Sequence, residues 1–205
     1  MNDQVLAGRG DGLFMKALAE EGGDMPTQFG MQLLVPGLLY GATALVAWAM
    51  LSGALDLPAS WMDWLWIPAT LIYVPILLVL RHRARSMIPG SGARVWIAAW
   101  SAMGLMSGAV LIALIMARGR INAPFLLLWP PIAFTLFGGA WAMLGIVRRQ
   151  SSYGFVAGGA FATAIVCAML ISTPTQWLVT GIGILLWVAG PGAVIVLGTR
   201  AASKS

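Results

Sequence analysis

The sequence predicts an all-α integral membrane protein with six transmembrane helices, and three observations support this fold class. Of the 205 residues, 60% are hydrophobic and only 9% are charged, whereas about 25% of an ordinary soluble domain is charged. Six apolar segments are each long enough to cross a bilayer, which takes about 20 residues. The basic residues are concentrated in short loops between these segments, which is typical of loops that orient a membrane protein.

Residues 1–30 are polar and lack the early apolar core of a secretory signal peptide, so we expect this segment to be retained. Within it we predict a short amphipathic helix over 11–21, with Asp11 as its N-cap and Leu13, Phe14 and Leu18 on its apolar face. So short a helix is marginal alone in water. We therefore expect it to dock at the inner membrane surface.

The acidic residues at the end of this helix suggest what it docks on. Glu20 and Glu21 are expected to point toward Arg83, Arg85 or Arg148, because the loops on that side of the membrane are basic. A disordered N-terminal tail is the alternative.

The segment FMKALAEEG at residues 14–22, followed by a glycine-rich first span and five more spans, resembles a group of small, uncharacterised bacterial inner-membrane proteins of about this length. The resemblance implies a bacterial cytoplasmic (inner) membrane, with the chain crossing it several times. It implies no activity.

We expect one membrane domain over 31–200 and a short tail at 201–205. The predicted spans cover residues about 31–53, 61–80, 95–117, 124–147, 153–171 and 177–198. The second span opens with Trp61, Trp64 and Trp66, as expected for aromatic residues at a membrane interface. Such a chain has the lipid bilayer as its first partner.

Basic residues predict that both termini are cytoplasmic. Ten of the twelve then lie inside: Arg9, Lys16, Arg81, Arg83, Arg85, Arg94, Arg148, Arg149, Arg200 and Lys204. The inverted topology would place ten outside, against the positive-inside rule. The two exceptions, Arg118 and Arg120, are expected to face Asp56 and Asp63, the acidic residues on the outer side.

Glycine pairs four residues apart occur in three spans, at Gly37/Gly41, Gly104/Gly108 and Gly154/Gly158. Small residues at this spacing let two helices approach closely. Packing within the chain and dimerisation explain the pairs equally well.

Prolines interrupt the even-numbered spans. They are Pro68 and Pro75 in the second span, Pro130 and Pro131 in the fourth, one to two turns in, and Pro191 in the sixth. Inside a helix, proline kinks the backbone and frees a carbonyl group. The freed carbonyls could line a transport path together with Thr70, Tyr73 and Thr135, although simple kinking is the other reading.

Several classes of function lack the residues they need. No Asp, Glu, Lys, Arg or His falls in the middle of a span, which argues against a carboxylate-based proton pump, a metal transporter or an intramembrane metalloprotease. His82 is the only histidine and Cys167 the only cysteine, so no haem, metal or other cofactor is expected. A copper site at Met103, Met106 and Cys167 is disfavoured because methionine is ordinary apolar filler.

The leading functional hypothesis is therefore a non-enzymatic membrane protein of unknown biochemical function that binds a partner or regulates one. The candidate cytoplasmic contacts to that partner or to lipid are Arg81, Arg83, Arg85, Arg148, Arg149, Glu20 and Glu21. The alternative is a small transporter or lipid-handling protein that uses the proline-broken spans. An enzyme is disfavoured because no nucleophile–base pair is evident, and nucleic acid is not an expected partner.

Overall fold

The computed structural model describes residues 27–84, 91–117 and 127–202, which are helical apart from short connections. In chain order the helices are α2 (Thr27–Leu51), the 3-10 helix η1 (Ala59–Asp63), α3 (Trp66–Ala84), α4 (Ser91–Ala117), α5 (Trp129–Arg148), α6 (Ser151–Met169), α7 (Pro174–Ile184), the π-helix η3 (Leu185–Ala189) and α8 (Gly190–Ala202). Six helical segments are long and apolar enough to cross a membrane. The predicted all-helical, multi-pass membrane architecture is confirmed to that extent.

Some sequence predictions fall on residues outside this description, and two concern whole segments or pairs. One is the amphipathic helix over 11–21. The other is the pairing of Arg118 and Arg120 with Asp56 and Asp63, because neither arginine, nor the side chain of Asp63, is among the described groups.

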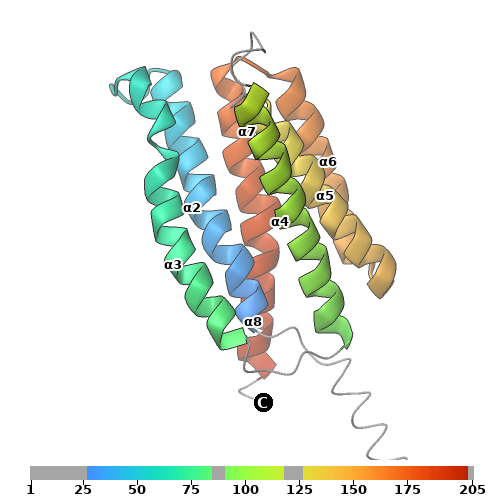
Figure 1. The fold of residues 1–205 in the computed structure, drawn as a ribbon. Coiled ribbons are helices and arrows are strands. Elements are labelled where there is room, and N and C mark those ends of the chain that lie inside the picture. The colour runs from blue at the N-terminus through green and yellow to red at the C-terminus, as the bar shows by residue number, and fades with distance from the viewer. Residues whose placement is uncertain (1–26, 85–90, 118–126, 203–205) are drawn as a thin grey trace, which may run out of the picture.

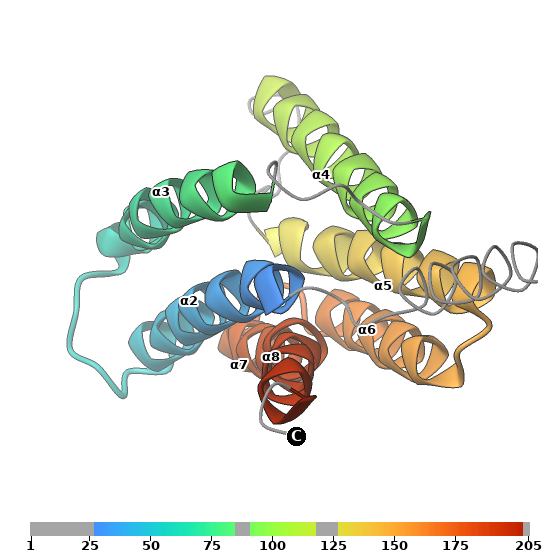
Figure 2. The ribbon, with the colours of Figure 1, turned by 90° about the horizontal axis from the view of Figure 1, so that it is seen from below.

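The spans run in alternating directions (Figure 1). One end of the bundle holds the start of α2, the ends of α3 and α8, and the turn at Arg148–Ser151; we call it the basic end. Seen along the bundle, α2, α5, α6 and the α7–α8 span form the packed centre, whereas α3 lies beside α2 and α4 beside α5 (Figure 2). The two outlying helices are separated from each other.

Glycine allows α2 to lie almost backbone to backbone against the last span. A methyl group placed on Gly37 would lie 2.5 Å from the backbone nitrogen of Ala189, and one on Gly192 would lie 2.5 Å from that of Leu34. Such distances leave no room for a side chain. This is the close approach that small residues permit between helices in a membrane, where dispersion contacts replace the hydrophobic effect.

The prolines of the second and fourth spans mostly begin helices rather than break them. Pro68 is the third residue of α3, and Pro130 and Pro131 stand in the first turn of α5, which starts at Trp129. The first turn of a helix has no backbone partner for its N–H groups, so a proline costs little there. The fourth span is therefore not proline-broken, contrary to our expectation. Of these three prolines and Pro75, Pro75 alone lies inside its helix.

The sixth span is irregular just before Pro191. The backbone N–H of Gly190 donates to the carbonyl of Leu185, five residues earlier, which is the π-helical pattern. Pro191 has no N–H to continue the α-helical ladder, and its ring crowds the preceding turn. The side chain of Trp187, within the π-helix, donates from Nε1 to Thr163 Oγ1 at 2.9 Å and so ties this irregular turn to α6.

At the basic end, an aromatic cluster holds α4 against the bundle. Trp96 and Trp100 of α4 and Trp141 of α5 form a triangle with ring centroids 5.4–5.5 Å apart. Phe29 of α2 contacts Trp96, and Tyr153 of α6 stacks on Trp141. The cluster thus joins four helices, with both Trp96 and Trp141 fully buried.

Candidate functional site: the face between α3 and α4

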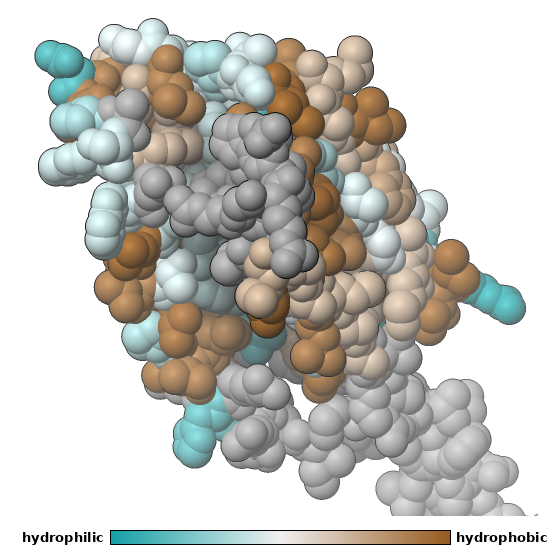
Figure 3. Space-filling view, turned by 45° about the horizontal axis from the view of Figure 1, so that its top comes forward, coloured by the Kyte–Doolittle hydropathy of each residue, from teal (hydrophilic) through white to brown (hydrophobic). Residues whose placement is uncertain are grey.

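The two outlying helices leave one side of the bundle open. Among the described residues, α2 is the only helix with extensive contacts to α3, and α5 the only one with extensive contacts to α4. Only 6% of the most apolar part of each of these two spans is buried inside the protein, against 39% for the span of α2 and for the last span. In Figure 3, paler residues of lower hydropathy are visible behind and between the brown, strongly hydrophobic side chains.

Three side chains that carry hydroxyl groups lie together on the α2–α3 side of this face. Tyr40 stands at the midpoint of the span Phe29–Leu51, and Thr70 at the midpoint of Ser60–Leu80. Their hydroxyl oxygens are 3.1 Å apart, and Thr70 Oγ1 also donates to the carbonyl of Trp66 at 2.9 Å. The ring of Tyr73 meets that of Tyr40 edge-on at 6.0 Å. We call Tyr40, Thr70 and Tyr73 the hydroxyl cluster.

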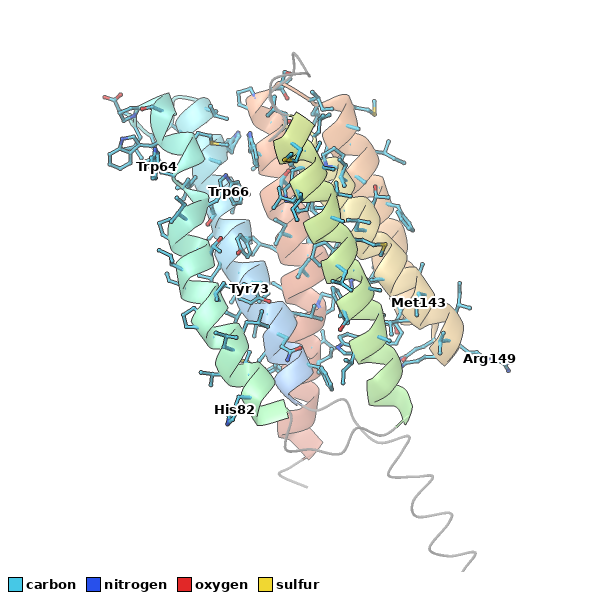
Figure 4. The ribbon with its side chains drawn as sticks, viewed as in Figure 1. Trp64, Trp66, Tyr73, His82, Met143 and Arg149 are labelled. Carbon is cyan, nitrogen blue, oxygen red and sulfur yellow. The ribbon has the colours of Figure 1, made fainter. Side chains whose placement is uncertain are left out.

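An aromatic row continues from this cluster toward the end opposite the basic end. Trp66 lies nearly parallel to Tyr40 with centroids 6.4 Å apart, and contacts Trp177 of α7 at 5.4 Å. Figure 4 shows Trp66 and Tyr73 extending from α3 toward α2, while Trp64 points away from the bundle. Trp64 is 69% exposed, as suits an aromatic residue at a membrane interface.

Polar atoms without partners mark the far end of the row. Gln176 is fully buried, and its Nε2 donates to the Leu127 carbonyl at 2.6 Å. Its Oε1, Trp66 Nε1 and Trp177 Nε1 are all buried without a hydrogen-bond partner in the described part of the chain. Buried polar atoms of this kind are rare in native structures, where each usually finds a partner.

Of the three residues predicted to line a path in mid-membrane, the structure places only two close together. Thr70 and Tyr73 belong to the hydroxyl cluster, but Thr135 lies on α5 and donates to the Pro131 carbonyl of its own helix at 2.8 Å. Tyr40, Trp177 and Gln176 were missed by sequence reasoning. Gln176 carried a usable signal, because it is a polar amide at the start of an apolar span.

The predicted cytoplasmic contacts gather at the basic end as far as they are described. Arg81 and Arg83 fall in the last turns of α3, although their side chains are not among the described groups, and Arg85, Glu20 and Glu21 lie outside the described residues. Arg148 ends α5, and Arg149 caps it with an exposed side chain that points outward in Figure 4. The predicted contact of Glu20 and Glu21 with these arginines therefore stays a prediction.

Glycine pairs that look alike in the sequence differ in the structure. Gly37 and Gly41 face the last span closely, whereas a methyl group placed on Gly104 or Gly108 of α4 meets no atom within 4 Å. The same holds for Gly154 and Gly158 of α6. Gly104 and Gly108 thus face no other helix closely within the described part of the chain, whereas the backbone nitrogen of Gly154 lies 3.2 Å from a methyl group placed on Gly145 of α5.

Compared with family models, with curated proteins and with solved structures, the chain matches none.

Proposed function

We propose that the chain is a multi-pass protein of the bacterial cytoplasmic membrane with both termini in the cytoplasm. The support for this topology is the distribution of basic residues, ten of twelve on one side, together with the positive-inside rule. The bacterial assignment derives from the resemblance of residues 14–22. The alternation of the spans agrees with termini on one side (Figure 1).

Within this topology we propose a non-enzymatic, partner-binding role, with α4 as the surface that receives a transmembrane helix of the partner. The observation that carries this proposal is the open glycine face of α4, at Gly104 and Gly108. Within the described ranges this helix is packed extensively against α5 alone. A glycine face lets another helix approach closely and gain dispersion contacts that lipid tails supply poorly. The Ser107 hydroxyl donates to Met103 Sδ at 3.6 Å, so this polar group of α4 is already paired within its own helix.

The basic end supplies a second contact in this proposal. Arg148 and Arg149 at the end of α5, with the arginines that follow the α3 span, place positive charge where anionic lipid heads or an acidic partner segment would meet it. These contacts orient the protein, and α4 selects the partner.

A single glycine substitution tests the role of α4. The full-length protein, carrying Gly104→Leu or no change, is purified from its native membranes in native lipid, and co-purifying proteins are identified by mass spectrometry. A stoichiometric membrane protein is expected with the unchanged chain and should be lost with Gly104→Leu, because the added side chain projects from the open glycine face and prevents the close approach of a second helix.

The matched control is Gly158→Leu, the same change on another open glycine, on α6. This variant should keep the partner. Purification of the unchanged chain alone, or equal recovery of the partner with both variants, would contradict the proposal.

A further inference from the structure

The hydrogen bonds of the hydroxyl cluster leave specific groups available. Thr70 Oγ1 gives its proton to the Trp66 carbonyl, so Tyr40 is the donor in the 3.1 Å contact between the two hydroxyls. Tyr73 makes a ring contact with Tyr40, but its hydroxyl has no hydrogen bond to any group in the described ranges. The cluster therefore offers a free O–H donor from Tyr73.

The position of Tyr73 along its span indicates what kind of molecule can accept the hydrogen bond of its hydroxyl. Thr70 is at the centre of its span, and Tyr73 is one helical turn further on, about 5 Å along the axis. Water is scarce at that depth, and an unpaired polar group in hydrocarbon costs several kcal/mol. The contact between Tyr40 and Thr70 is exposed rather than enclosed. A partner can therefore reach the cluster from the bilayer.

We propose that the hydroxyl cluster binds an uncharged, carbonyl-bearing molecule dissolved in the membrane. A carbonyl oxygen of this ligand accepts the proton of Tyr73, and its apolar body lies against the rings of Tyr40 and Trp66. An uncharged ligand is specified because no Asp, Glu, Lys, Arg or His belongs to the cluster or lies in the middle of a span. An acceptor is specified because the free group is a donor.

Two kinds of membrane molecule carry such a carbonyl: a quinone, whose ring could also stack on the aromatic side chains, and a glycerolipid, through its ester groups. Both have the same hydrogen-bonding chemistry. This site lies on α2 and α3, whereas the proposed partner surface lies on α4, so the two proposals can fail separately.

The test uses the full-length protein in nanodiscs of ether-linked phospholipid, which has no ester carbonyl to compete. A short-chain ubiquinone and dioctanoylglycerol are titrated separately, and binding is measured by equilibrium dialysis against empty nanodiscs. Saturable binding of one probe at one per protein is expected, and the probe that binds identifies the source. Lack of saturable binding by either probe would overturn the inference.

Two conservative variants locate the site. Tyr73→Phe removes the donor and keeps the ring, and should weaken binding about five- to tenfold, the usual worth of one neutral hydrogen bond. Tyr153→Phe makes the same change in the aromatic cluster at the basic end and should leave binding unchanged. Equal effects of both variants, or no effect of Tyr73→Phe, would overturn the assignment to this cluster.

A photoreactive diazirine version of the bound probe gives an independent readout. Labelled peptides should come from α2 and α3. Labelling confined to other helices would place the ligand elsewhere and reject the proposal, even where binding is saturable.

Discussion

Among the described residues, two adopt a left-handed backbone without being glycine. Arg149 has φ 52° and caps α5, its N–H bonding to the carbonyls of Gly145 and Ile146, and Ser172 has φ 70° in the turn between α6 and α7. The side-chain Cβ makes this conformation unfavourable by about 1 kcal/mol. At Arg149 this conformational cost is accepted in place of a glycine, which is consistent with a role for the arginine's positive charge at the basic end.

Replacing these residues with glycine should stabilise the fold. Arg149→Gly and Ser172→Gly are each expected to raise the free energy of unfolding by about 0.5–1 kcal/mol, because glycine adopts positive φ freely. Thermal unfolding in detergent measures the effect.

The reverse change provides the control. Gly53 has φ 77° and no atom within 4 Å of an added methyl group, so Gly53→Ala should destabilise by about 1 kcal/mol through the backbone alone. A stabilised Gly53→Ala variant would show that the backbone argument is wrong.

At the scale of helices, α2 is held to the last span by glycines and α4 to the bundle by tryptophans. The glycine contact allows no substitution, because the neighbouring atoms include the backbone of Ala189 and Leu34. The tryptophan contact depends on the large buried surface of Trp96 and its neighbours. The two kinds of helix contact predict different effects of mutation on the free energy of unfolding.

Gly37→Ala should destabilise the protein by about 2 kcal/mol or more, since the added methyl group forces α2 and the last span apart. Gly104→Ala adds the same methyl group where nothing lies within 4 Å, and should leave unfolding almost unchanged. Denaturation of the purified protein in one detergent compares the two variants. Similar losses in both would mean that the close approach at Gly37 does not occur.

Trp96→Ala should cost about 3 kcal/mol, because it removes a fully buried ring that joins α4 to α2 and α5. The neighbouring Ile97 is 41% exposed, so Ile97→Ala should cost well under half as much. Protease accessibility of α4 in detergent gives a second measure, since only the Trp96 variant should release the helix. Unchanged proteolysis of that variant would argue that α4 is held by other contacts.

The existence of the spans could be predicted because a long apolar segment has few alternatives to a membrane helix. Their packing could not. In α3 and α4 apolar residues surround the whole helix, so no polar stripe distinguishes the protein-facing side from the lipid-facing side. Gly37/Gly41 and Gly104/Gly108 have identical spacing, yet among the helices that the structure describes only the first pair meets another one.

The residue at which a helix begins within an apolar segment could not be predicted from the sequence either. Residues before Trp129 are as apolar as those after it, so Pro130 and Pro131 were placed inside the span, although they open α5. For the candidate site, Thr70 and Tyr73 were found as polar residues among apolar ones. Their partner Tyr40 is 30 residues away from Thr70, and helix periodicity gives no information about contacts between different helices.

The whole molecule combines a packed centre with two outlying helices on one side. The centre accounts for the glycine and aromatic contacts, and the outlying helices expose the faces to which the partner and ligand proposals refer (Figure 2). The proposed contacts of the basic end with a cytoplasmic partner or with anionic lipid heads depend on which end of the bundle faces the cytoplasm. The topology is therefore the central claim.

Labelling of single cysteines tests this topology most directly. The native Cys167 is buried and is replaced by alanine, and one cysteine is introduced at Ser151 at the basic end or at Thr173 at the opposite end, both exposed positions. An impermeant thiol reagent added to intact cells should label Thr173→Cys and should label Ser151→Cys only after permeabilisation. Labelling of Ser151→Cys in intact cells, with Thr173→Cys protected until the cells are opened, would contradict the topology and the account built on it.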